Sequence, residues 1–188
     1  VALDMRMDRS EEQNAGHFLA EKGEEELAQA FRDFGEERKA KRLAREIVKR
    51  RSSGPVQTSD DLVAALSVSL GRAPSARDKA RIFQAVRIAV NEELEALKLA
   101  LPAIREVMND KAVMVVISYH SLEDRLVKNT FRDWSRNCVC PPEFPLCTCR
   151  GRSLGEILTK RPVRPSNKEV DINPRARSAR LRAWRRAA

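Results

Sequence analysis

The chain has 188 residues, of which 42% are hydrophobic and 34% are charged, so it can bury a core. No apolar run approaches the ~20 residues of a membrane-spanning helix, and the first residues lack the basic and apolar regions of a secretory signal. These features exclude a membrane protein and predict a soluble, cytoplasmic one.

The formal net charge is +9, and it is unevenly placed. Residues 1–135 hold 23 basic and 23 acidic residues, whereas residues 136–188 hold 13 basic and 4 acidic ones. The basic end suits a polyanion such as RNA. A solvated basic tail would give the same composition, so both interpretations stay open here.

Residues 3–8, Leu-Asp-Met-Arg-Met-Asp, alternate apolar and charged side chains. This pattern fits a short strand or an extended loop. The segment 10–108 then reads as one helix after another, and we expect Gly35 to end one of them in the left-handed conformation. Residues 36–51 form a helix with an apolar stripe bordered by basic side chains, which would either meet phosphates or form a solvated face.

The longest helical pattern runs over residues 75–101, where apolar positions nearly surround the helix axis. We therefore expect one continuous, central and buried helix. The charge of Arg87 lies among these apolar positions and needs a partner. Glu92 or Glu93 can supply it.

The continuous apolar run Ala112–Ile117 is typical of a strand buried on both faces, as in a parallel sheet. A polar cluster follows, and we expect a helix to begin near Ser121, with Ser121 as its N-cap and Asp124 as the acidic partner of a capping box. The carboxyl end of a parallel strand is where open α/β sheets bind ligands. A plain strand, turn and cap would look the same.

The cysteines follow the pattern Cys-x-Cys, six residues, Cys-x-Cys, at positions Cys138, Cys140, Cys147 and Cys149. Four thiolates can give zinc a tetrahedral sulfur shell, but zinc knuckles usually have Cys-x₂-Cys spacing. Free thiols and disulfides are the alternatives, and disulfides need an oxidising compartment. A metal here would be structural.

At the basic end, residues 156–163 are predicted to be a strand that ends at Pro162, and residues 165–174 a loop. Residues 178–184 alternate enough to form the last strand of the sheet. The arginines that surround this strand either contact RNA, since guanidinium groups fit phosphates, or cover the rim of the sheet.

Five stretches carry a resemblance to one family. Residues 116–125, Val-Ile-Ser-Tyr-His-Ser-Leu-Glu-Asp-Arg, resemble the signature of the MraW/RsmH family, which has Phe where this chain has Tyr119. Residues 3–8 match a family motif completely, although Val-Ala precedes it here in place of the usual Gly-Pro. Further stretches resemble family motifs at residues 34–45, 82–94 and 173–182, the last with Arg180 in place of Lys. The family comprises S-adenosylmethionine-dependent methyltransferases that act on a cytosine N4 of 16S ribosomal RNA.

This resemblance implies an α/β fold: a partial class I, Rossmann-like methyltransferase sheet with a large inserted all-helical domain. The implied domains are residues 1–9, the inserted residues 10–108, and residues 109–188, with the last strand as an antiparallel edge strand. The resemblance covers about the latter two-thirds of the family's length. The chain begins without Met and none of its seven glycines forms Gly-x-Gly, so we expect it to be the later part of a longer protein.

The resemblance also implies site residues. The candidates that hydrogen-bond the target base or take its proton are Asp4, Asp8, His120 and Glu123, and Ser118 is a candidate for cofactor contact. The candidates for RNA contact are Arg6, Arg38, Arg42, Arg125, Arg175, Arg177 and Arg180. The implied partner is the 16S RNA of the small ribosomal subunit. The alternative is a non-catalytic RNA-binding or ribosome-assembly module, stabilised by zinc.

Overall fold

The structure is a computed structural model that describes residues 1–140, 146, 148–149 and 151–188. The chain divides into two compact units, Val1–Glu93 and Leu94–Ala188. The sequence-derived domain bounds remain a prediction. Within the described part of the chain, no helix combines the length and the apolar character needed to cross a membrane.

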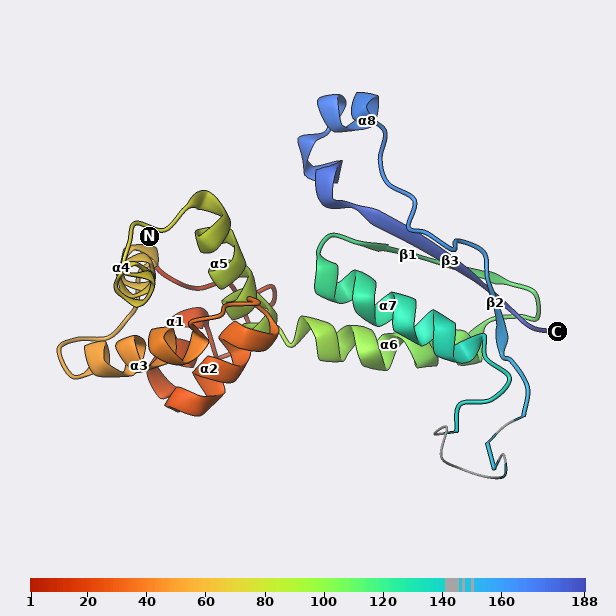
Figure 1. Cartoon of the computed structure of the whole chain (residues 1–188), viewed down its shortest axis with the longest axis horizontal. Helices are drawn as coiled ribbons and strands as arrows, with labels where there is room; N and C mark the ends of the chain where they lie inside the picture. The colour runs from red at the N-terminus through yellow and green to blue at the C-terminus, as the bar shows by residue number, and fades with distance from the viewer. Residues whose placement is uncertain (141–145, 147, 150) are drawn as a thin grey trace. The chain divides into compact units, whose positions relative to one another are not determined.

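The first unit is helical, drawn from red to yellow-green in Figure 1. Its helices are α1 (Ala15–Glu21), α2 (Glu24–Asp33), α3 (Ala40–Arg51), α4 (Ser59–Leu70) and α5 (Ala76–Val90). Their apolar stripes meet in one core that includes fully buried Phe31, Leu43 and Ile82. Capping boxes at Thr58–Asp61 and Ser75–Asp78 begin α4 and α5, because each pair satisfies backbone N–H groups of the first turn.

Two expectations about these helices were wrong. The continuous helix predicted over residues 75–101 is broken, since α5 ends at Val90, Asn91 is its C-cap and Glu92 has a positive φ of 48°. Arg87 does pair with Glu93, at 2.8 Å, as expected. Gly35 does not adopt the left-handed conformation, which occurs at Glu36 instead. A Cβ on Gly35 would lie 2.7 Å from the Phe31 carbonyl oxygen, so close packing requires the glycine.

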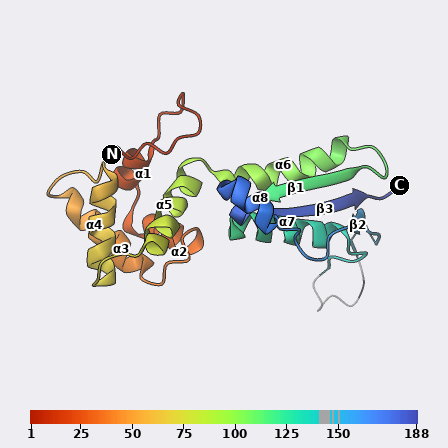
Figure 2. The same cartoon turned by 90° about the horizontal axis from the view of Figure 1, so that it is seen from above.

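The second unit combines helices with a small sheet (Figure 2). The elements are α6 (Glu93–Val107), β1 (Val113–Ser118), α7 (Ser121–Trp134), β2 (Gly155–Ile157), α8 (Asn167–Ile172), the 3₁₀ helix η1 (Pro174–Ser178) and β3 (Arg180–Arg186). The strand order is β1-β3-β2, with antiparallel pairing throughout. The predicted last strand is thus antiparallel as expected, but it lies between two strands and not at an edge. The loop predicted for residues 165–174 was wrong because it contains α8.

The β1 strand confirms the predicted strand but corrects its environment. Val113, Val115 and Ile117 are 46%, 54% and 53% exposed, whereas Met114 is buried. The strand therefore has one covered face, so the prediction of burial on both faces was wrong for the residues described. Its partner β3 is the antiparallel last strand, so parallel pairing of β1 with other strands stays a prediction.

Helices α6 and α7 pack on the covered face of the sheet (Figure 1). Their shared core contains Leu101 from α6, Phe131 and Trp134 from α7, and Trp184 from β3. Trp184 is fully buried, and its indole N–H donates to Ser135 Oγ at 3.1 Å. The core and the sheet together fix the position of the turn that joins β1 to α7.

Candidate functional site

The turn between β1 and α7 carries the candidate His120. His120, and not Ser121, is the N-cap of α7, so the predicted Ser121–Asp124 capping box was wrong. The backbone N–H of Glu123 donates to His120 Nδ1 at 3.3 Å. In return Glu123 Oε2 accepts from the backbone N–H of Tyr119 at 2.9 Å and of His120 at 3.3 Å. The helix start thus brings the two candidates together and holds both in place.

This cap also determines where the imidazole carries its proton. Because His120 Nδ1 accepts a hydrogen bond, the neutral ring carries its hydrogen on Nε2. His120 Nε2 lies 3.4 Å from Glu123 Oε1, and the ring is only 8% exposed. This arrangement places a proton donor, the His120 Nε2–H, beside a proton acceptor, the Glu123 carboxylate, at the carboxyl end of β1.

The predicted capping residue Asp124 has a different role. Its carboxylate accepts from Arg182 Nε at 2.6 Å and Nη2 at 3.2 Å, and from Arg180 Nη1 at 3.3 Å. Burial raises the pKa of Asp124, but the hydrogen bonds and charges of Arg182 and Arg180 outweigh this effect and leave that pKa below its usual value. Asp124 therefore ties α7 to β3. Ser118, the candidate for cofactor contact, donates its hydroxyl to the Arg180 carbonyl at 3.3 Å.

The loop at residues 3–8 lies in the first unit and holds the other acidic candidates. Asp4 accepts from Arg6 Nε at 2.6 Å and Nη2 at 3.0 Å. The side-chain hydrogen bond from Arg6 lowers the pKa of Asp4 to about 2. Asp8 accepts from the backbone and hydroxyl of Ser10, and the backbone bond is the main cause of its lowered pKa. Arg6 is thus engaged inside the loop, where it also donates to the Glu11 carbonyl.

Sequence reasoning missed the residue that positions this loop. Asn91 Oδ1 accepts from the Met7 backbone N–H at 2.7 Å, and its Nδ2 donates to the Met5 carbonyl at 2.9 Å. These two bonds fix the backbone of the residues before and after Arg6. The first of them, Met5, has a positive φ of 61°. An amide among apolar helix positions was the available signal, because such a group needs hydrogen-bond partners.

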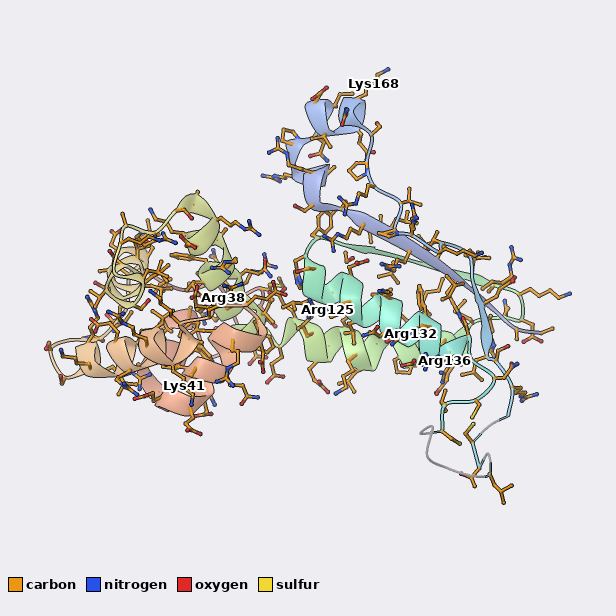
Figure 3. All side chains as sticks on the ribbon, viewed as in Figure 1. Arg38, Lys41, Arg125, Arg132, Arg136 and Lys168 are labelled. Atoms are coloured by element: carbon orange, nitrogen blue, oxygen red, sulfur yellow. The ribbon has the colours of Figure 1, made fainter. Side chains whose placement is uncertain are left out.

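The remaining RNA-contact candidates lie on separate elements. Arg38 is exposed in the turn before α3, Arg42 is exposed on α3, and Arg175 and Arg177 are exposed on η1. Arg125 begins an exposed basic series on α7 that sequence reasoning did not assemble (Figure 3). Its members on the helix recur at intervals of three or four residues and so follow one side of α7: Arg125, Lys128 and Arg132. Arg136 continues the series just beyond the end of the helix.

Three of the four cysteines fall within the described residues, and Cys147 lies outside them. The Sγ atoms of Cys138, Cys140 and Cys149 all lie within 4.8 Å of one another. The backbone N–H of Thr148 is the main cause of the lowered pKa of Cys140. The structure thus brings thiols from the two sides of this loop together.

Comparison with known proteins gives one consistent result. A model of the MraW methylase family matches residues 1–187. The ribosomal RNA small subunit methyltransferase H of Gemmatimonas aurantiaca is 55% identical over 185 residues, covering 98% of this chain and 59% of the relative. The proteins of the same name from Heliobacterium modesticaldum and Brevibacillus brevis are 46% and 42% identical, with 96% of this chain and 59% and 58% of the relative covered. The chain therefore spans less than two-thirds of the length of these curated relatives.

Proposed function

The chain belongs to the MraW methylase family, and from this premise we propose that it is part of an S-adenosylmethionine-dependent enzyme that methylates a cytosine N4 of 16S ribosomal RNA. The observation that carries the proposal is the match over residues 1–187 together with the fixed His120–Glu123 pair at the end of β1. The proposed partner is the small ribosomal subunit, and the proposed location is the cytoplasm.

The fold of the second unit is compatible with a larger class I sheet. Among the residues described, β1 pairs only with β3, and the apolar side chains of Val113, Val115 and Ile117 are exposed. A strand with an open edge and an uncovered apolar face is completed by further elements in most stable sheets. We attribute that completion to the part of the relatives that this chain does not match, with the first unit as the inserted helical domain.

The proposed chemistry requires a base that can accept a proton from the target amine. An exocyclic cytosine amine is a poor nucleophile because its lone pair is delocalised into the ring, so the enzyme must align it and take its proton. Asp4 is a weak base, since Arg6 keeps its pKa at about 2. Asp8 is also disfavoured by its lowered pKa. In this proposal the Glu123 carboxylate is the proton acceptor, with the His120 Nε2–H beside its Oε1, and Asp4 serves to hold Arg6.

The residues of this chain do not form a complete binding site for the proposed cofactor. A Gly-rich turn is absent from the sequence, although class I enzymes use such a turn to approach the nucleotide closely. At the end of β1, the Ser118 hydroxyl and the backbone N–H groups of Tyr119 and His120 already donate within the protein. S-adenosylmethionine, which would supply the methyl group, is thus held mainly by the remaining part of the protein in this proposal.

RNA contact is assigned to the exposed arginines of α3, α7 and η1. Arg38, Arg42, Arg125, Arg175 and Arg177 present guanidinium groups at the surface, as phosphate binding requires. Arg6 and Arg180 are less suitable, because Asp4 and Asp124 respectively engage them.

The test joins this chain to the remainder of the Gemmatimonas aurantiaca relative and measures N4-methylcytidine in purified small subunits by nucleoside mass spectrometry. His120→Asn is the informative variant, because Asn is also a favourable N-cap and only the imidazole is lost. We expect its rate to fall by about tenfold or more, because the Nε2–H beside the Glu123 carboxylate is lost and a hydrogen bond to a charged group contributes about 1.5–3 kcal/mol. The control is His17→Ala, which removes the other histidine of the chain and should leave the rate unchanged.

If the joined protein binds 16S RNA but never forms N4-methylcytidine, the methyltransferase proposal is wrong and the non-catalytic RNA-binding module takes its place. The 188-residue chain alone should show no appreciable S-adenosylmethionine binding by calorimetry. Micromolar binding would contradict the assignment of the cofactor to the remaining part of the protein.

A further inference from the structure

Two hydrogen bonds join the two ends of the loop between α7 and β2, which form the base of the loop. The Leu154 backbone N–H donates to the Trp134 carbonyl at 2.7 Å, and the Ser153 N–H donates to Asn137 Oδ1 at 3.1 Å. Beyond this base, the described apolar residues of the loop are solvent-exposed: Val139 is 42% and Leu146 is 76% exposed. Hydrophobic burial of these two side chains therefore does not hold the loop together.

The thiol positions indicate a different interaction. Cys138 and Cys140 lie on the segment leaving α7, and Cys149 lies on the segment returning to β2. Cys138 Sγ and Cys149 Sγ are 3.8 Å apart, well beyond the ~2.05 Å of a disulfide bond. Two thiolates bound to one tetrahedral zinc, with Zn–S bonds of ~2.3 Å, have their sulfur atoms about 3.8 Å apart. The observed separation fits shared coordination and not a covalent bond between these two cysteines.

The surrounding backbone also suits a metal site. The Val139 N–H donates to Cys149 Sγ at 3.4 Å. Such N–H···S bonds orient metal-bound thiolates and stabilise their negative charge. Three thiol sulfurs lie within 4.8 Å of one another, and a weak hydrogen bond joins Cys149 Sγ to Cys138 Sγ. Deprotonated by a metal ion, the same sulfur atoms would become its ligands without a large movement.

We propose that Cys138, Cys140 and Cys149 bind one structural zinc ion that closes the loop between α7 and β2. Soft thiolate ligands in a tetrahedral arrangement select zinc over harder divalent cations. The ion links the two sides of the loop and has no part in the chemistry proposed for His120. Cys147 lies outside the described residues, so the fourth ligand is left to the experiment.

The first experiment measures protection of the thiols in the untagged wild-type chain, which avoids any variant that fails to fold. The reduced protein is alkylated with iodoacetamide after chelation and again with one equivalent of zinc, and each cysteine is followed by peptide mass spectrometry. Because a metal-bound thiolate is withdrawn from reaction, we expect zinc to slow alkylation of Cys138, Cys140 and Cys149 together by about tenfold or more. Equal protection of Cys147 would identify the fourth ligand. Unchanged rates for the three would overturn the proposal.

The second experiment is elemental analysis of protein purified without chelators. We expect about one zinc per wild-type chain and below about one tenth in the Cys138→Ser/Cys149→Ser variant. The control is Ser153→Ala, which alters the base of the same loop, keeps every thiol and should keep its zinc. Zinc retained by the double cysteine variant, iron or copper in place of zinc, or a disulfide found under anaerobic purification would each refute the assignment.

Discussion

The ion pair between α7 and β3 gives the sharpest stability prediction. Asp124 and Arg182 have side chains only 11% and 8% exposed, and they meet through two hydrogen bonds. Asp124→Ala would leave the Arg182 guanidinium buried without its carboxylate. Breaking a buried pair from one side typically costs about 3–5 kcal/mol. With a urea m-value of about 2 kcal/mol/M, the unfolding midpoint should fall by about 1.5–2.5 M.

The matched control lies on the same helix. Asp133 pairs with Arg132 and Arg136 at 3.8 and 3.9 Å, and its side chain is 53% exposed. Asp133→Ala should therefore cost at most about 1 kcal/mol. Tryptophan fluorescence is a selective assay, because the only tryptophans, Trp134 and Trp184, both lie in the core of the second unit. Equal effects of the two substitutions would show that burial does not decide the strength of these pairs.

The same pair predicts a pH dependence. The folded-state pKa of Asp124 is below its usual value, so the stabilisation is complete above the unfolded-state pKa of about 3.9 and is lost as the pH falls through the folded-state pKa. The stability difference between wild type and Asp124→Ala should thus be constant from pH 7 to about pH 5 and shrink below about pH 4. A difference that grows on acidification would refute this account.

Three further substitutions test other parts of the structure. Gly155→Ala would place a Cβ 2.1 Å from the Arg185 carbonyl oxygen and 2.3 Å from the Trp184 ring, so we expect a loss of about 1–3 kcal/mol or more in urea unfolding; an unchanged midpoint would contradict this packing. Asn91→Ala removes two hydrogen bonds to the loop at residues 3–8. It should speed tryptic cleavage after Arg6 by about 30-fold, since each bond contributes about 1 kcal/mol, and equal cleavage rates would show that other contacts hold the loop. Arg177→Ala should weaken binding to 16S RNA and reduce the magnitude of the slope of log affinity against log salt concentration by about 1. The control Lys98→Ala removes a charge that is paired with Glu95 and should leave this slope unchanged. Identical slopes for the two variants would show that Arg177 does not contact the RNA.

The sequence was sufficient to predict the elements that a local residue pattern determines. It was not sufficient where a contact with a distant residue determines the backbone conformation. The apolar run of β1 and the alternation of β3 were sufficient to predict both strands. The break after α5 was not predictable from helix propensity, because the Asn91 amide bonds to a loop more than 80 residues earlier in the chain. Gly35 likewise depends on close packing against the Phe31 carbonyl oxygen and the Ala85 side chain, which no local turn pattern reveals.

The candidate site shows the same division. The motif at residues 116–125 was sufficient to single out His120 and Glu123, but residue preferences favoured Ser121 as the cap. An imidazole nitrogen can replace the serine oxygen as acceptor, and this moved the helix start by one residue. The role of Asp124 was missed because its partner Arg182 lies at a distant position in the chain. The pairing of β1 with β3 brings Arg182 close to α7, which follows β1 and carries Asp124.

The uncovered side of β1 has a consequence for the behaviour of this chain in solution. Among the described residues β1 is paired along one edge only, and Val113, Val115 and Ile117 face water. Such a strand is a template onto which a second copy can add its own β1. Self-association of the isolated 188-residue chain should therefore rise with concentration in sedimentation velocity, and a charged substitution such as Val115→Lys should suppress it. Supplying the rest of the relative's length in the same polypeptide should abolish it as well, because the edge is then occupied from within.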